Sequence, residues 1–152
     1  MEYSHFKQKV YQHCISKITR RINNTKESII SIQQAAKEET KSSMGDKYET
    51  GRAMAHLELE KQQAALSNLL NIQEAFNGIN PKEIHDKIKP GTLLHTSIGW
   101  IYVVSALGKI KIEDIEVMVI SPIAPIITML KSVLEGGQAK LHGKELHIHK
   151  IT

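Results

Sequence analysis

Residues that interrupt helices are confined almost entirely to the second half of the chain. All four prolines follow residue 80, and the only glycines before Gly78 are Gly45 and Gly51. Proline breaks the interior of a helix and glycine weakens it, so the first half can form long helices and the second half must use short elements. The distribution therefore predicts two structurally different domains, residues 1–78 and residues 79–152.

The first domain has the apolar spacing of two long helices. Apolar residues recur at steps of three, four or seven, which places them on one stripe of a helix. The first stripe consists of Phe6, Val10, Cys14, Ile18, Ile22, Ile29, Ile32 and Ala36, and the second, from about Arg52, of Met54, Leu57, Ala64, Ala65, Leu69, Ile72 and Phe76. A turn-like segment, residues 42–51, separates them. We predict an antiparallel α-helical coiled-coil hairpin, because helices this polar need a partner.

The start of the first helix extends beyond the predicted reach of the second. If the hairpin folds about residue 46, Phe76 faces Ser16, and Phe6, Val10 and Cys14 have no partner on the second helix. Their apolar stripe nevertheless continues without interruption. We expect these three side chains to pack on the C-terminal domain or on another chain.

Residues 79–152 show short apolar runs that are rich in β-branched residues and separated by glycine, as is typical of strands. The runs are Thr92–Thr96, Trp100–Val104, Glu116–Ile120, Gln138–Leu141 and Glu145–Ile151. One helix is expected from Pro125 to Leu134, since proline is favoured at the first helical position. We predict a small antiparallel β-sheet domain of about five strands with one helix, and hence an α+β chain.

Composition excludes several classes of protein. A hydrophobic fraction of 41% and a mixed charged fraction of 24% are not those of a disordered chain. A net charge of +4 is too small for a polybasic nucleic-acid tail, and a single cysteine excludes an internal disulfide or a cysteine-rich zinc module. Because neither a secretory signal nor a membrane-spanning segment is visible, we expect a cytoplasmic protein without membrane contact.

Two acidic residues, Asp46 and Glu49, lie in the turn-like segment between the predicted helices. Two carboxylates three residues apart can bind one Mg²⁺ together, although further ligands would have to come from a partner. The same Asp-x-x-Glu spacing is typical of a helix capping box, with Asp46 as the N-cap residue. The two interpretations are compatible, and both remain open.

At this point the chain resembles the Gre family of bacterial transcript-cleavage factors, GreA and GreB. The tip sequence Gly45-Asp46-Lys47-Tyr48-Glu49 is similar to the Asp-x-x-Glu motif of that family. In the second half, the segment 120–124 (Ile-Ser-Pro-Ile-Ala) is similar to the family's serine-proline element, and residues 136–137 and 146–151 are similar to its final turn and strand. The resemblance covers nearly the whole chain.

The resemblance implies a fold and a function. It implies an N-terminal coiled coil, a C-terminal FKBP-like domain, and an accessory factor of RNA polymerase that is not itself an enzyme. Such a factor enters the secondary channel of the polymerase, and its tip acids, here Asp46 and Glu49, hold a second Mg²⁺ shared with the polymerase, which then cleaves backtracked RNA. Contact with nascent RNA would be indirect, and the factor would act as a monomer or a homodimer.

The resemblance also implies residues that bind the polymerase. Ser121 and Pro122 belong to the serine-proline element of the C-terminal domain. Lys17, Arg20 and Arg21 form a basic cluster on the first helix, which suits an acidic polymerase surface or the 3′ segment of the RNA. An ordinary solvated helix face is the alternative interpretation of that cluster.

Two alternative functions remain open. The first is a non-cleaving Gre-like regulator or inhibitor of RNA polymerase, because Lys47 and Arg52 place positive charge beside the tip acids and compete for their carboxylates. The second is a coiled-coil adaptor or homo-oligomer unrelated to transcription. The unpaired stripe at Phe6, Val10 and Cys14 motivates this adaptor hypothesis.

Overall fold

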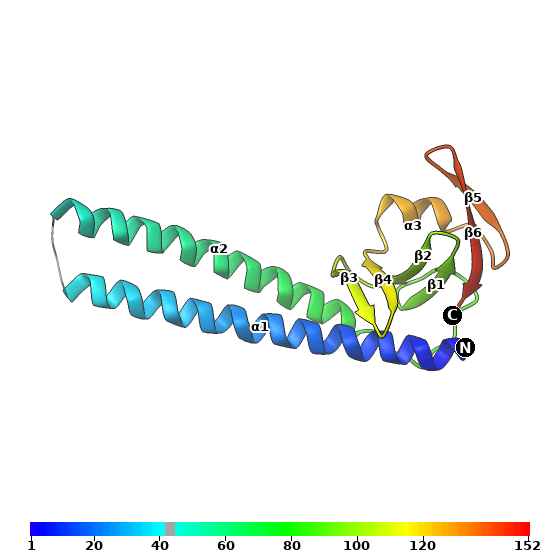
Figure 1. The fold of residues 1–152 in the computed structure, drawn as a ribbon, viewed down its shortest axis with the longest axis horizontal. Coiled ribbons are helices and arrows are strands. Elements are labelled where there is room, and N and C mark those ends of the chain that lie inside the picture. The colour runs from blue at the N-terminus through cyan, green and yellow to red at the C-terminus, as the bar shows by residue number, and fades with distance from the viewer. Residues whose placement is uncertain (42–44) are drawn as a thin grey trace. The chain divides into compact units, whose positions relative to one another are not determined.

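The chain is an α+β protein in which two long helices precede a six-stranded mixed sheet with one small helix (Figure 1). The computed structural model describes the backbone of residues 1–41 and 45–152. It describes the side chains of all residues except residues 39–48. The helices are α1 (Tyr3–Lys41), α2 (Gly45–Asn77) and α3 (Pro125–Leu130). The strands are β1 (Thr92–Thr96), β2 (Gly99–Val103), β3 (Gly108–Ile112), β4 (Ile115–Ile120), β5 (Gln138–Leu141) and β6 (Lys144–Ile151).

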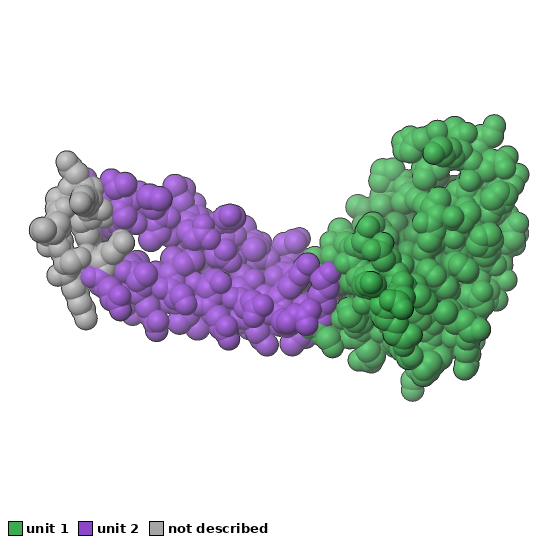
Figure 2. All heavy atoms as spheres, in the orientation of Figure 1, with its two compact units in different colours: residues 1–16, 72–152 green, residues 17–71 purple. Residues whose placement is uncertain are grey.

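Two compact units divide the chain, and each contains part of both long helices (Figure 2). The first, here called the sheet unit, comprises Met1–Ser16 and Ile72–Thr152. The second, here called the helical unit, comprises Lys17–Asn71. The borders between the units therefore fall inside α1 and α2.

One stripe along α1 is covered, as its spacing predicts. Burial is greatest at the first five positions of the stripe, which are Phe6, Val10, Cys14, Ile18 and Ile22. The next three positions, Ile29, Ile32 and Ala36, are half-buried. The predicted stripe of the first helix is therefore confirmed, with burial that decreases toward the C-terminal end of the helix.

The covered stripe of α2 agrees with the predicted one only in the C-terminal part of the helix. Met54 and Leu57 are 66% and 64% exposed, and Ala64 and Ala65 are exposed as well. The covered positions are Gly51, Ala55, Leu59, Gln62, Leu66, Leu69, Ile72 and Phe76. These residues are also three or four apart. Leu69, Ile72 and Phe76 were predicted correctly, whereas the prediction missed the covered positions before Leu69, several of which are small or polar.

In the helical unit, segments 17–41 and 45–71 lie side by side and antiparallel (Figure 1). Ile32 and Ala36 of α1 and Ala55 and Leu59 of α2 line a hollow between them. Between residues 23 and 68, none of the side chains that the structure describes is fully buried. This part of the unit is therefore held together by half-buried side chains, and the fully buried side chains described for the unit lie outside residues 23–68.

The six strands are ordered β3-β4-β2-β1-β6-β5. Neighbouring strands are antiparallel except for β2 and β4, which are parallel with Trp100 opposite Val117. The prediction of an antiparallel sheet is therefore wrong, because the sheet is mixed. The reason is the additional strand β3, which forms an antiparallel hairpin with β4 at the sheet edge and so returns the chain in the direction of β2.

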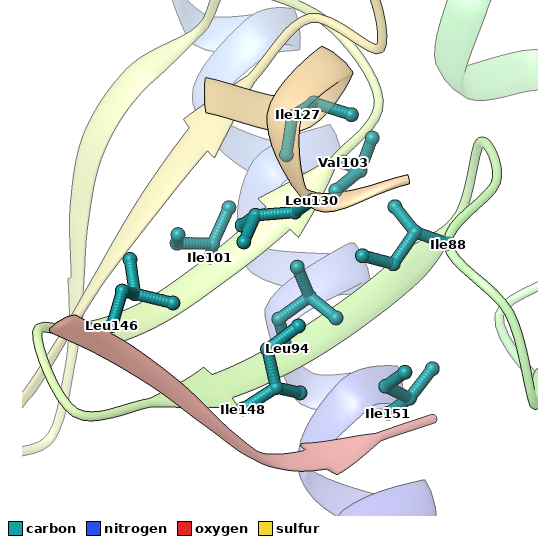
Figure 3. Packing of buried hydrophobic residues seen from close by; sticks show 9 residues of the cluster. All are labelled: Ile88, Leu94, Ile101, Val103, Ile127, Leu130, Leu146, Ile148 and Ile151. Carbon is teal, nitrogen blue, oxygen red and sulfur yellow. The ribbon is translucent and has the colours of Figure 1, made fainter. Parts of the chain in front are cut away.

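Both faces of the sheet are covered inside the sheet unit. On one face, α3 and the strands bury a shared cluster of nine residues (Figure 3): Ile88, Leu94, Ile101, Val103, Ile127, Leu130, Leu146, Ile148 and Ile151. On the other face, the rings of Phe76 and Tyr102 are 6.3 Å apart, and Phe6 contacts Trp100 edge-on at 4.8 Å. Alternate residues of β2 therefore face the cluster and the long helices, as strand geometry requires.

The first turns of α1 pack against the sheet, which confirms one of the two predicted partners for this part of the helix. Val10 and Cys14 are fully buried in the sheet unit. The Tyr11 hydroxyl donates to the Phe76 carbonyl oxygen at 3.2 Å. This hydrogen bond joins α1 to the last turn of α2 within the sheet unit.

The segment after β4 forms a shorter helix than predicted. Helix α3 ends at Leu130, and a turn follows in which the Val133 amide donates to the Leu130 carbonyl oxygen at 2.9 Å. The predicted end was Leu134, which is 63% exposed. In the part of the chain that the structure describes, no helix combines the length and apolarity needed to cross a membrane.

Candidate functional site

The two tip acids lie at the start of α2. The helix begins at Gly45, so Asp46 is inside the first turn and not at the N-cap position that the capping-box interpretation assigned to it. Glu49 is exposed, whereas the side chain of Asp46 lies outside the described residues. Positions three apart on a helix share one side. The helical backbone therefore suits the predicted pair of carboxylates, and acids in a first turn also favour the helix dipole.

The Mg²⁺ prediction requires ligands from outside the chain. Among the described residues, no group of three or more His, Cys, Asp or Glu side chains is placed to hold a metal ion. Glu49 presents the type of oxygen ligand that Mg²⁺ prefers. The Mg²⁺ shared with a partner therefore stays a prediction.

The predicted basic cluster lies on α1 within the helical unit. Arg20 and Arg21 are exposed, and Lys17 is half-buried. The Arg21 carbonyl oxygen accepts a hydrogen bond from the Thr25 hydroxyl at 2.8 Å, which leaves the guanidinium group outside this contact. Positions 17, 20 and 21 share one side of the helix. The cluster therefore presents two exposed guanidinium groups and one partly covered ammonium group.

The serine-proline element forms a tight turn between β4 and α3. The Ser121 Oγ accepts a hydrogen bond from the Ile123 amide at 3.3 Å, and the Ser121 carbonyl oxygen accepts one from the Ala124 amide at 3.0 Å. Ser121 and Pro122 are half-buried, whereas Ile123 is 85% exposed. The turn therefore displays a large apolar side chain that sequence reasoning did not single out.

An apolar groove of about 450 Å³ lies beside this turn. Trp100 and Met118 come from the sheet, and Ile120 and Ile126 flank the serine-proline turn. The salt bridge between Lys109 and Glu116, 3.4 Å long, lies at the same groove. The groove was not predicted, because it depends on the parallel pairing of β2 and β4.

A buried lysine joins the start of α1 to the connector before β1. Lys7 is 1% exposed, and its Nζ donates to the Glu83 carbonyl oxygen at 2.6 Å. Burial lowers the pKa of Lys7 to about 8, the Glu83 carboxylate opposes this change, and the charge of Lys89 adds to it. Sequence reasoning missed Lys7, although it lies four residues from both Tyr3 and Tyr11 on the covered side of the helix.

His85 completes this buried network. Its Nδ1 lies 2.7 Å from the Thr92 Oγ1, and its Nε2 lies 3.7 Å from a Glu83 carboxylate oxygen. Burial and the charges of Lys7 and Lys89 hold the pKa of His85 below its usual value. The network therefore favours a neutral imidazole, which fixes the connector against β1.

The buried charge of Lys7 predicts a specific dependence of stability on pH. The folded pKa is about 8 and the unfolded value is 10.5, so between these values the unfolded chain binds more protons and stability rises with pH. Relative to Lys7→Met, the wild-type free energy of unfolding should therefore increase by about 2 kcal/mol from pH 7 to pH 9.5. Urea unfolding of both proteins across this range measures the difference.

The matched control is Lys26→Met, which removes an exposed lysine from the same helix. Its stability difference from the wild type should stay constant over the same pH range. A constant difference for Lys7→Met as well would contradict the buried charge.

An aromatic and histidine cluster lies where α1 meets β1 and β2. The rings of His95 and Trp100 stack at 4.1 Å with an angle of 7°, and His149 contacts His95 edge-on at 5.3 Å. Tyr3 lies 5.8 Å from Trp100. Partial burial lowers the pKa of His95, and the nearby His149 adds to this effect. The cluster anchors the first turn of α1 on the sheet.

No family model, no curated protein and no solved structure matches the chain.

Proposed function

We propose that the chain is a Gre-like transcription elongation factor that binds RNA polymerase through the secondary channel. Residues 1–78 would form its antiparallel coiled-coil hairpin, and residues 79–152 its FKBP-like domain. The observation that supports this proposal best is the position of Asp46 and Glu49. Both lie at the start of α2, directly after the connection between two long antiparallel helices.

The length of α2 supports a role at a distance. From Glu49 to Ile72, where the sheet unit resumes, the helix rises by about 35 Å. An acid at one end of such a helix can reach a deep site while the other end stays outside. A helix of this length suits a binding site inside a channel better than a binding site on an open surface.

The tip residues would act together with the polymerase. Asp46 and Glu49 would each provide carboxylate oxygens to a Mg²⁺ shared with the polymerase active site. When bound, such a Mg²⁺ would activate a water for the hydrolysis of the RNA phosphodiester. The chain's own residues position carboxylates and break no bond, so the chain is an accessory factor and the polymerase is the enzyme.

Docking would use other parts of the chain. The exposed guanidinium groups of Arg20 and Arg21, with Lys17 beside them, suit an acidic wall of the channel. The turn formed by Ser121 and Pro122 would contact the outer surface of the polymerase. The exposed Ile123 side chain strengthens this second assignment, because large exposed apolar groups mark interaction sites.

A transcript-cleavage assay tests the proposal. The wild-type chain is added to backtracked complexes of the cognate polymerase, and the rate of 3′ cleavage is measured together with binding to the core enzyme. Faster cleavage supports the elongation-factor proposal. Binding without faster cleavage favours the non-cleaving regulator, and absence of binding contradicts both.

The non-cleaving regulator remains the second candidate because of Arg52. This exposed residue lies three positions after Glu49 on α2, a spacing at which side chains of opposite charge interact. The adaptor hypothesis has lost its motivation, because Phe6, Val10 and Cys14 are covered by the chain itself.

A further inference from the structure

A polar groove of about 540 Å³ lies within the sheet unit, away from the tip acids and the serine-proline turn. One wall is formed by α1 between residues 5 and 16. The connector supplies Lys82, and the turn between β3 and β4 supplies Glu113. All of these residues belong to the same compact unit.

The groove is lined by several hydrogen-bond donors and by two lysines. His5, Lys9 and His13 follow one another at steps of four along α1 and line the same wall. Lys82 lies on the connector side, is exposed, and has no ion-pair partner among the described residues. Such a set of side chains suits an anionic ligand.

Glu113 is the only carboxylate that lines the groove, and it is held there by an unusual backbone. Its φ of 55° lies in the left-handed region, which is unfavourable for a glutamate. Its carboxylate lies 3.5 Å from the Lys9 Nζ. The neighbouring Asp114 is exposed on the same turn, and the nearby Glu83 carboxylate is held by Lys89 at 2.8 Å. The groove therefore already contains one carboxylate.

We propose that this groove binds an acidic peptide segment of a partner protein and that Glu113 competes with that segment for Lys9. Lys9 and Lys82 bind the partner's carboxylates, and the amide and imidazole groups beside them donate further hydrogen bonds. Glu113 occupies the place of one carboxylate until the partner displaces it. The inference does not depend on the proposed function at the helix tip.

Two observations favour a peptide over a single-stranded nucleic acid. The lining contains no Phe, Tyr or Trp side chain, and unpaired bases are normally bound by stacking on such rings. In addition, the group that Lys9 already contacts is a carboxylate. An acidic peptide reproduces that contact directly.

Fluorescence anisotropy with a labelled ten-residue peptide of alternating Glu and Gly tests the proposal on the full chain. Glu113→Gln removes the competing charge and keeps the backbone conformation nearly unchanged, so it should bind the peptide about two- to fivefold more tightly than the wild type. Glu113→Gly should show the same gain and also relieve the unfavourable φ. Lys9→Ala/Lys82→Ala should bind at least about fivefold more weakly and lose part of the salt dependence.

The matched control is Lys140→Ala/Lys144→Ala, which removes two exposed lysines from the β5–β6 hairpin of the same unit. Its peptide affinity should equal that of the wild type, and circular dichroism checks that every variant is folded. An oligouridine probe of equal charge provides the second arm. Tighter binding of oligouridine than of the peptide, equal affinities for the two double variants, or no gain with Glu113→Gln would each overturn the proposal.

Discussion

The Asp46→Ala/Glu49→Ala variant is expected to stimulate cleavage of backtracked RNA about 10²- to 10³-fold less than the wild-type chain. This estimate corresponds to the several kcal/mol by which a bound metal ion stabilises a phosphoryl-transfer transition state. The variant removes both carboxylates that would hold the shared Mg²⁺. The measurement is the single-turnover cleavage rate of a defined backtracked complex at saturating factor.

The control for this variant removes two other acids from the same helix. Glu58 and Glu60 are exposed on α2, and Glu58→Ala/Glu60→Ala should cleave at the wild-type rate. The tip variant should still compete with the wild type for the polymerase, because the proposed docking residues are unchanged. Equal cleavage by the tip variant and the wild type would remove Asp46 and Glu49 from the mechanism.

The Phe76→Ala variant is expected to lose about 3–5 kcal/mol of unfolding free energy, a large part of the stability of a chain this size. Phe76 is fully buried, and its ring lies 6.1 Å from that of Tyr11 and 6.3 Å from that of Tyr102. Its removal leaves a cavity between the long helices and the sheet. Chemical denaturation monitored by circular dichroism measures the loss.

Leu57→Ala provides the control on the same helix. Leu57 is 64% exposed, and alanine is at least as good a helix former as leucine. Its unfolding free energy should therefore stay within about 0.5 kcal/mol of the wild type. Equal losses for the two variants would mean that the covered stripe of α2 is assigned to the wrong residues.

The long helices show how much of a covered helix face the spacing of apolar residues can predict. The stripe of α1 contains large side chains at regular steps, so the sequence was sufficient to predict it. The stripe of α2 includes Gly51, Ala55 and Gln62, and its neighbours Met54 and Leu57 are exposed. Size and apolarity alone therefore selected exposed positions in the N-terminal part of α2 and covered positions only from Leu69 onward, because packing of two helices also uses small and polar residues.

The sheet shows a second limit of sequence reasoning. Each of the five predicted strands is found with bounds that differ by at most one residue at either end. Strand β3 was missed, since Lys109 and Lys111 interrupt its two isoleucines and the strand lies at the edge. This one omission also reversed the expected direction of β4, because strand direction depends on how many strands precede it.

The candidate sites were predictable to different degrees. Asp46 and Glu49 could be proposed from the sequence because their chemistry and spacing are local, and their role stays a prediction. The buried Lys7 and the groove at Lys9 could not be found in this way. Their environments depend on Glu83 and Glu113, which are more than 70 residues away along the chain and are brought close only by the fold.

The sheet unit is assembled from two separate stretches of chain, Met1–Ser16 and Ile72–Thr152, and the helical unit is inserted between them. The length of the inserted helical unit can therefore be changed without changing the sequence of the sheet unit. Removing or adding seven residues in each helical segment would keep the facing stripes in register and change the helix length by about 10 Å. A series of such chains would test how the length of the helices affects the proposed activity of the tip acids.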